Sequence, residues 1–187
     1  MSNIELILKA QNYGKNFIYE TPLLFNSKVN QIIGKNIFIK PECLQVTGSF
    51  KFRGAWCAIS HLKQENKISN GVVTYSSGNH AQAISLAAKK IGMKAYIVMP
   101  SNAPEIKKEA VKGYGGELIE CEPNLEAREA AAQDVVDSKS ATFIHPSNNI
   151  DVILGQGTAT KELIEQYGSF DHILVTIGGG GLIAGSD

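Results

Sequence analysis

A regular alternation of apolar runs and helix-like segments, beginning near Gly71, most constrains the fold of this 187-residue chain. The apolar runs occupy residues 72–75, 95–99, 117–120, 142–144 and 172–177. The segments between and around them have helical spacing and occupy residues 79–91, 104–112, 125–137 and 152–167. Strands that alternate with helices in this way predict parallel βαβ units, because parallel neighbours need a crossover connection. We therefore predict an α/β fold whose sheet is covered on both faces.

The segment before this alternation is less regular. It predicts a helix near residues 4–11, a strand at 36–40 and a helix from about 50 to 64. In open α/β sheets, ligands bind beyond the carboxyl ends of the strands. Three loops at such positions stand out, at residues 46–51, 76–80 and 178–181. We expect these loops to form the functional site.

Composition excludes several classes of protein. Eighteen basic residues balance eighteen acidic ones, and 43% of the residues are hydrophobic, which is typical of a globular protein with a sizeable core. A nucleic-acid partner held by a strong basic field is not expected. No apolar stretch reaches the ~18 residues of a membrane helix, and no secretory signal is seen at Met1. Cys43, Cys57 and Cys121 show no metal-ligand spacing, which favours reduced thiols in a cytoplasmic protein without a metal centre.

The first loop presents a lysine at the start of a helix. Ser49 is a good N-cap candidate, which places Lys51 in the first helical turn. Phe50 and Phe52 flank that lysine, so the segment is not expected to be fully exposed, although a solvated surface lysine is the alternative. Partial burial and the positive end of the helix dipole both favour a neutral amine. A neutral amine is what Schiff-base chemistry requires.

The second loop is Ser76-Ser77-Gly78-Asn79-His80, between a strand and a helix. Free backbone N–H groups at such a junction bind anions, including carboxylates. The alternative is a simple turn capped by Ser77 or Asn79, because both residue types are preferred caps. His80 is a base by residue type, but a histidine beside small helical residues is more often structural.

The third loop, Gly178–Gly181, lies between an apolar run and an apolar helix start. Four glycines let backbone amides close around a phosphate. A flexible linker is the alternative, and the apolar flanks argue against it. Gly179, Gly181 and Ala184 also match the dinucleotide pattern G-x-G-x-x-G/A, but this match is weak, because the supporting acidic residue ~20 residues later would lie beyond Asp187.

Together and in this order, the three loops resemble motifs of the fold-type II (tryptophan synthase β-like) pyridoxal-phosphate enzymes, above all the serine/threonine dehydratases and serine racemases. The resembling segments are Thr47-Gly-Ser-Phe-Lys-Phe-Arg-Gly-Ala55, Ser76-Ser-Gly-Asn-His-Ala-Gln82 and Gly178–Gly181, with weaker similarity at Gly155-Gln156-Gly157-Thr158. The resemblance implies two domains. Residues 1–70 and 148–187 would form a partial larger domain, and residues 71–147 a complete smaller one.

The resemblance also implies roles for individual residues. Lys51 would hold pyridoxal 5'-phosphate (PLP) covalently and act as base at the substrate α-carbon, and Ser77 would carry the proton on the opposite face. Cofactor binding would fall to Phe50, Lys51, Asn79, Gly178, Gly179, Gly180 and Gly181. The substrate carboxylate would bind among Ser76, Ser77, Gly78 and His80. Two departures stand out, because Val46 and Ser147 replace a lysine and an asparagine found in racemases.

The function that this resemblance implies is a PLP-dependent ammonia-lyase. Its substrate would be L-threonine, L-serine or a similar β-hydroxy amino acid, converted to a 2-oxo acid and ammonia. A serine racemase is the alternative, and a non-catalytic ligand-binding fragment is a further one. Family chains continue beyond the glycine loop, so the ring-nitrogen partner and any divalent-metal ligands are expected beyond Asp187. We also expect a homodimer in the full-length form, and poor stability or inactivity of the isolated chain.

Overall fold

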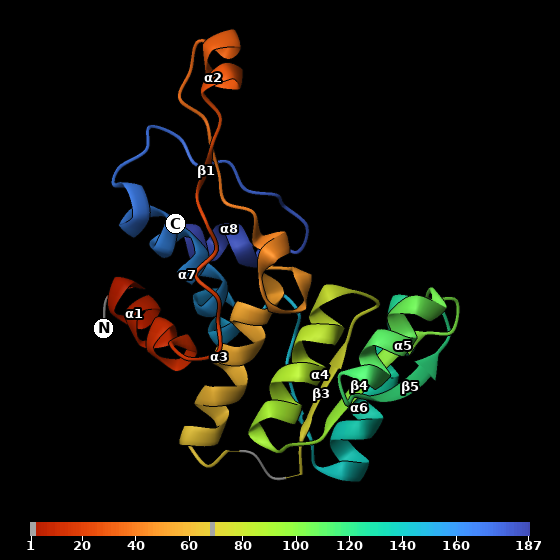
Figure 1. Cartoon of the computed structure of the whole chain (residues 1–187). Helices are drawn as coiled ribbons and strands as arrows, with labels where there is room; N and C mark the ends of the chain where they lie inside the picture. Colours follow the sequence, from red (N-terminus) through yellow and green to blue (C-terminus); the bar gives the residue numbers. More distant parts are fainter. Residues whose placement is uncertain (1–2, 68–69) are drawn as a thin grey trace.

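Figure 1 shows the computed structural model of the chain, which describes residues 3–67 and 70–187. Its centre is a four-stranded parallel sheet with the strand order β5-β4-β3-β6. The strands are β3 (Val72–Tyr75), β4 (Ala95–Pro100), β5 (Glu117–Cys121) and β6 (Thr142–Phe143). All six residues of β4 are buried, as expected for a strand covered on both faces. The predicted parallel α/β sheet is therefore present.

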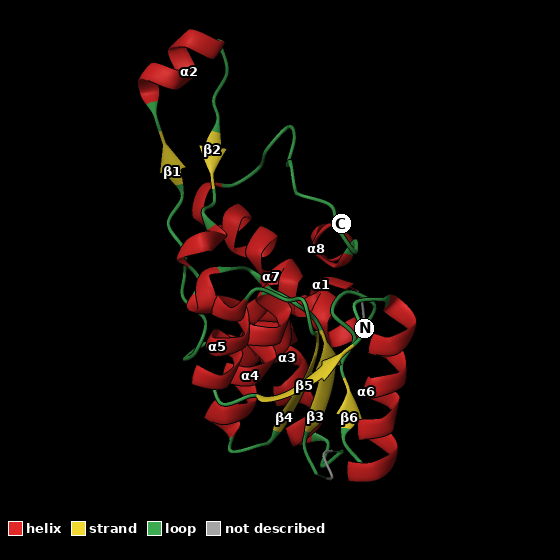
Figure 2. Cartoon of the chain, turned by 90° about the vertical axis from the view of Figure 1, so that its right-hand side faces the viewer, coloured by secondary structure: helices red, strands yellow, loops and turns green. Residues whose placement is uncertain are grey.

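Helices cover both faces of this sheet (Figure 2). Helices α4 (Asn79–Ile91) and α5 (Glu105–Gly113) pack on one face, and α6 (Leu125–Lys139) packs on the other. Side chains alternate between the two cores along each strand. Val72 and Ile97 belong to the core beneath α4, whereas Val73 and Tyr96 belong to the core beneath α6.

Capping residues fix the helix ends close to the predicted positions. The side chain of Asn124 accepts from the backbone N–H of Ala127 at the start of α6. Gly92 ends α4 with a φ of 78°, a left-handed conformation that glycine adopts without the steric cost of a Cβ. The strand-loop-helix connections of the sheet are therefore fixed by local sequence.

A second group of helices packs beside this layered unit. It consists of α1 (Asn3–Gly14), α3 (Lys51–Gln64), α7 (Ile150–Tyr167) and the short α8 (Gly181–Ser186). An arm formed by β1 (Leu24–Phe25), α2 (Ser27–Ile33) and β2 (Phe38–Ile39) projects away from them (Figure 1). The short 3₁₀ turns η1 (Glu42–Leu44) and η2 (Val46–Gly48) lead from the arm into α3. The domain division at residues 71 and 148 stays a prediction.

Two predictions about strands need correction. The predicted strand at residues 172–177 is not formed, and Leu174 and Ile177 are 96% and 70% exposed. The reason is that a strand needs a hydrogen-bonded neighbour, and none lies beside this segment in the described part of the chain. The predicted strand at 36–40 is reduced to β2, which pairs antiparallel with β1 rather than joining the parallel sheet.

Within residues 3–67 and 70–187, the helices are all too short or too polar to cross a bilayer.

Candidate functional site

The carboxyl edge of the parallel sheet gathers loops that are distant in sequence. Residues 76–80 follow β3, and residues 144–149 follow β6, its hydrogen-bonded neighbour. The start of α3 joins them, because Lys51 contacts the segment after β6. The glycine loop also reaches this segment, since Gly179 and Gly181 pack against Ser147. The structure therefore brings the three predicted loops to the neighbourhood of one segment, residues 145–147.

Lys51 is the first residue of α3. Its Nζ donates a hydrogen bond to the backbone carbonyl of Pro146 at 2.8 Å and lies 5.2 Å from the centre of the Phe50 ring. Burial lowers the pKa of this amine, in the direction that the flanking phenylalanines predict. No acidic side chain pairs with Lys51 among the described residues, so no carboxylate opposes this lowering of its pKa. Such an amine can act as a nucleophile or a base.

The predicted N-cap of α3 is wrong. Phe50, not Ser49, occupies the N-cap position, and Ser49 has extended backbone angles (φ −165°, ψ 158°). Among the described residues, the Ser49 carbonyl accepts only a long hydrogen bond, 3.4 Å from the backbone nitrogen of Phe52, and the buried Ser49 hydroxyl has no partner. The Ser49 side chain is thus left free of the helix, beside Lys51.

The loop after β3 is not a side-chain-capped turn. Gly78 is the N-cap of α4, and neither Ser77 nor Asn79 caps the helix. The backbone N–H of Gly78 donates to the hydroxyl of Ser76 at 3.3 Å. Ser77 is half-buried. No sequence motif indicates that Lys107 lies here, yet its Nζ is the nearest atom, at 3.7 Å, to a Cβ built on Gly78.

His80 lies in the first turn of α4 and is 2% exposed. Burial and, second, the nearby charge of Lys51 lower the pKa of this imidazole to about 3. His80 is therefore neutral near pH 7. Neither ring nitrogen makes a well-aligned hydrogen bond in the described part of the chain, although the backbone of Ile144 lies close enough to raise the pKa. A neutral imidazole can donate or accept one hydrogen bond, but this histidine does not carry a charge in the site.

Close contacts and backbone conformation exclude side chains from most of the glycine loop. A Cβ on Gly179 would lie 2.4 Å from the Ser147 hydroxyl oxygen, and one on Gly181 would lie 2.9 Å from Gln156 Oε1. Gly180 has a φ of 83°, which side chains disfavour. Gly178 has neither constraint. Three of the four glycines are thus required by the local geometry, and the short side chain of Ser147 packs directly against one of them.

Orphaned polar atoms cluster around these loops. The described side chains with buried, unpartnered oxygen or nitrogen atoms are Tyr13, Thr47, Ser49, His80 and Gln156. All but Tyr13 lie on, or pack against, the loops that contain Lys51, Ser76–His80 and Gly178–Gly181. Buried polar groups in folded proteins are normally hydrogen-bonded, so a concentration of exceptions indicates a place where a polar ligand binds.

A buried ionic network braces the helix that carries Lys51. Arg53 is 1% exposed and binds both carboxylate oxygens of Glu42 (2.7 and 2.8 Å) and both of Glu162 (3.0 Å each). Lys40 also contacts Glu162, at 2.5 Å. Burial on its own raises the pKa of Glu162, but the bonds from Arg53 and Lys40 outweigh it and hold the pKa below its usual value. Helix α3 is thereby tied to η1 and α7.

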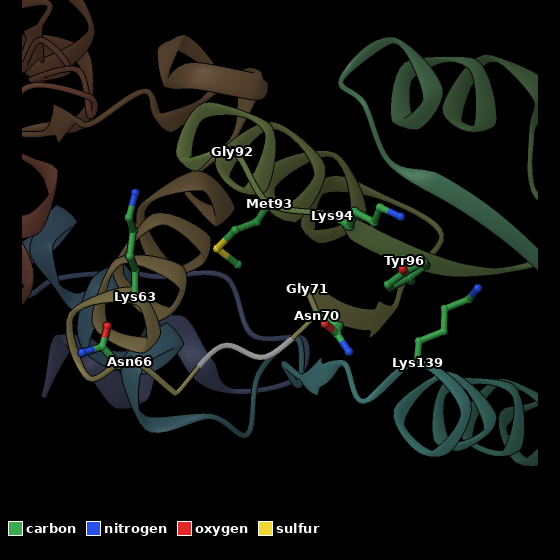
Figure 3. A pocket seen from close by; sticks show the side chains of 9 residues that line it. All are labelled: Lys63, Asn66, Asn70, Gly71, Gly92, Met93, Lys94, Tyr96 and Lys139. Carbon is green, nitrogen blue, oxygen red and sulfur yellow. The ribbon is translucent and has the colours of Figure 1, made fainter.

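A cavity of about 610 Å³ lies elsewhere, at the amino ends of β3 and β4 (Figure 3). It is lined by Lys63, Asn66, Asn70, Gly71, Gly92, Met93, Lys94, Tyr96 and Lys139. Lys63 donates to the carbonyl of Ile91, and the Lys139 amine lies 5.2 Å from the Tyr96 ring centre. Because ligands in open α/β sheets bind at the carboxyl ends of strands, this cavity is not the candidate site.

Comparison with known proteins identifies the family. A family model described as "Pyridoxal-phosphate dependent enzyme" matches residues 15–186. The chain belongs to this family. Its members use PLP as cofactor, and the fold described above is the fold-type II PLP fold that the sequence resemblance implies.

Individual relatives of this PLP-dependent enzyme chain include racemases and an ammonia-lyase. A serine racemase of Dictyostelium discoideum is 46% identical over 180 residues, 96% of this chain and 55% of the relative. An L-threo-3-hydroxyaspartate ammonia-lyase of Saccharomyces cerevisiae is 43% identical over 180 residues, again 96% and 55%. The structure of maize serine racemase matches with a TM-score of 0.94 and 45% identity, covering 98% of this chain and 55% of that one. The chain spans about half the length of the curated relatives it matches.

The residues present fit PLP. The amine of Lys51, whose pKa is lowered by burial, suits a bond to an aldehyde carbon, and the Phe50 ring lies beside that amine. The unpartnered atoms of Ser49, His80 and Gln156 supply polar groups for a ligand with a phosphate and a phenolic oxygen.

Proposed function

We propose that the protein carrying this chain is a PLP-dependent amino-acid racemase that acts on serine, with Lys51 and Ser77 as its two proton carriers. The observation that supports this proposal best is a desolvated lysine amine at the start of α3 and a half-buried serine in the loop after β3, in a chain 46% identical to a serine racemase. Racemisation needs one group that removes the α-proton and another that returns a proton on the opposite face.

The residues of this chain would move the protons and hold the substrate carboxylate. The chemistry that PLP supplies when bound is withdrawal of electrons from the substrate α-carbon. The amine of Lys51 takes the α-proton, and burial lowers the pKa of this amine toward the range of a base. The hydroxyl of Ser77 then gives a proton to the other face, which inverts the centre. The backbone N–H groups at the start of α4 and the Lys107 amine near Gly78 hold the substrate carboxylate.

The phosphate and the ring of the cofactor would be held by separate elements. The phosphate would lie on Gly178–Gly181, whose backbone can be approached closely because at three of its residues a side chain is excluded. Phe50 would pack beside the ring, and Asn79 would donate to the phenolic oxygen. Arg53 would position Lys51 without touching the cofactor, because the bonds of Arg53 go to Glu42 and Glu162.

A second candidate function is elimination of ammonia from a β-hydroxy amino acid. The 43% identity to a hydroxyaspartate ammonia-lyase supports it. The same removal of the α-proton by Lys51 would lead to it, if the β-hydroxyl left before a proton returned. The products would be a 2-oxo acid and ammonia. The two functions therefore differ in the step after proton removal.

Chiral chromatography separates the two functions. The protein, expressed from its native coding sequence and supplied with PLP, should convert L-serine to D-serine faster than to pyruvate. Ser77→Ala should suppress formation of D-serine more than formation of pyruvate, since only racemisation needs a second proton carrier. Pyruvate as the main product, with equal losses of both products in Ser77→Ala, would favour the ammonia-lyase. If neither D-serine nor pyruvate formed, both proposed functions would be contradicted.

A further inference from the structure

The Gly155-Gln156-Gly157 segment of α7 has no part in the function proposed so far. It lies where α7 contacts both α3 and α8 (Figure 1). A Cβ on Gly155 would lie 2.5 Å from the carbonyl oxygen of Arg53 in α3. A Cβ on Gly157 would lie 2.1 Å from the carbonyl oxygen of Gly185 in α8. The backbone of α7 is therefore in direct contact with the lysine helix and with the helix that follows the glycine loop.

Gln156 fills the space between these two contacts. Its side chain is fully buried, and a Cβ on Gly54 of α3 would lie 3.1 Å from its Cγ. At its far end, Oε1 lies 2.9 Å from a Cβ built on Gly181, the last residue of the glycine loop. The Gln156 side chain thus extends from the lysine helix α3 to the glycine loop.

The Gln156 amide has no hydrogen-bond partner among the described residues. Both Oε1 and Nε2 are buried, and neither finds a donor or an acceptor. A glutamine buried only for packing would be replaced at lower cost by methionine, which has a similar shape and no orphaned amide. The buried amide therefore lowers stability in the absence of a ligand. Because the amide lies next to Gly181, a ligand bound by the glycine loop could form the missing hydrogen bond.

We propose that Gln156 is a residue of the phosphate site, whose amide donates a hydrogen bond to the anion held by Gly178–Gly181. A half-turn of the amide exchanges its two ends, so the Nε2 donor can take the place beside Gly181 that Oε1 holds without a ligand. This inference rests on the proposed binding of PLP by the glycine loop. It adds a side chain from α7 to a site otherwise made of backbone groups.

The test compares two aldehydes that differ only in the phosphate, PLP and pyridoxal, in the full chain. Their dissociation constants are measured by absorbance titration for wild type, Gln156→Met and the surface control Gln133→Met. We expect Gln156→Met to weaken PLP binding about tenfold or more, the value of a hydrogen bond to a charged group, and to leave pyridoxal binding unchanged. Its melting temperature without ligand should equal or exceed that of wild type.

The opposite pattern would overturn the inference. If Gln156 were only structural, replacing it would lower the melting temperature. The replacement would also weaken the binding of PLP and pyridoxal equally, or would change the binding of neither. Should Gln156→Met fail to fold, Gln156→Asn keeps an amide but withdraws it by one methylene group. The asparagine variant should still weaken PLP selectively, and unchanged PLP affinity would reject the proposal. If wild type binds neither aldehyde, the proposed PLP function itself fails, which separates the two failures.

Discussion

Replacing Gly157 by alanine should displace the glycine loop and weaken PLP binding. The new Cβ would lie 2.1 Å from the carbonyl oxygen of Gly185, whereas ordinary contacts begin near 3.4 Å. Helices α7 and α8 must therefore separate by about 1.3 Å, the difference between these two distances. Because α8 begins at Gly181, this movement would also displace the phosphate loop Gly178–Gly181.

The magnitude follows from overpacking and misplacement. Overpacking of a tight contact costs about 1–3 kcal/mol of unfolding free energy. A displacement of about 1 Å weakens hydrogen bonds from the loop to the phosphate, each worth about 1.5–3 kcal/mol, so we expect the dissociation constant of PLP to rise by about tenfold or more. Urea denaturation measures the first quantity, and absorbance titration with PLP measures the second.

Gly113→Ala is the matched control. Gly113 lies in the last turn of α5, and a Cβ there would meet no atom within 4 Å. Because alanine is favoured over glycine in helices by about 1 kcal/mol, this variant should be slightly more stable and bind PLP normally. If Gly157→Ala bound PLP as tightly as Gly113→Ala and unfolded at the same urea concentration as wild type, the reasoning about close helix contact would be refuted.

Three further predictions concern charged residues. Arg53→Met should lower the unfolding free energy by about 3–5 kcal/mol, because it leaves the carboxylates of Glu42 and Glu162 without their buried cation; a loss below about 1 kcal/mol would count against the network. The pKa of Glu162 is lower in the folded state than its ordinary value of about 4.5, so the stabilisation from its charge is complete above that pH and is lost as the pH falls further. Below pH 4.5, the urea midpoint of Glu162→Gln should therefore change less with pH than the midpoint of wild type. Lys107→Met should raise the KM for L-serine several-fold without changing PLP affinity, because its amine lies near Gly78; an unchanged KM would remove Lys107 from the site.

The sequence predicted the layered sheet because local patterns determine it. The runs at Val72–Tyr75 and Ala95–Pro100 are rich in apolar and β-branched residues, and Gly92 ends the helix between them because glycine adopts the left-handed conformation that the helix end requires. The segment at 172–177 has the same apolar pattern but forms no strand. Apolar character indicates burial, whereas a strand also needs a neighbour whose presence no local pattern encodes.

The candidate site was partly predictable for a related reason. Lys51, Ser76–Asn79 and the glycine loop stand in short motifs with a chemical meaning of their own. The partners of Arg53 could not be predicted, since Glu162 lies 109 residues away in sequence and is one glutamate among many. Gln156 was visible only as part of a weak similarity, because nothing in its surroundings indicates that its amide is buried without a partner.

Chemical trapping tests most directly the claim that Lys51 is the PLP lysine. The chain is incubated with PLP, reduced with borohydride to make the bond to lysine permanent, digested and mapped by mass spectrometry. We predict that the pyridoxyl group is found on Lys51 and that Lys51→Ala takes up none. Labelling of another lysine in wild type with Lys51 unmodified, or equal labelling of Lys51→Ala, would contradict the proposed site.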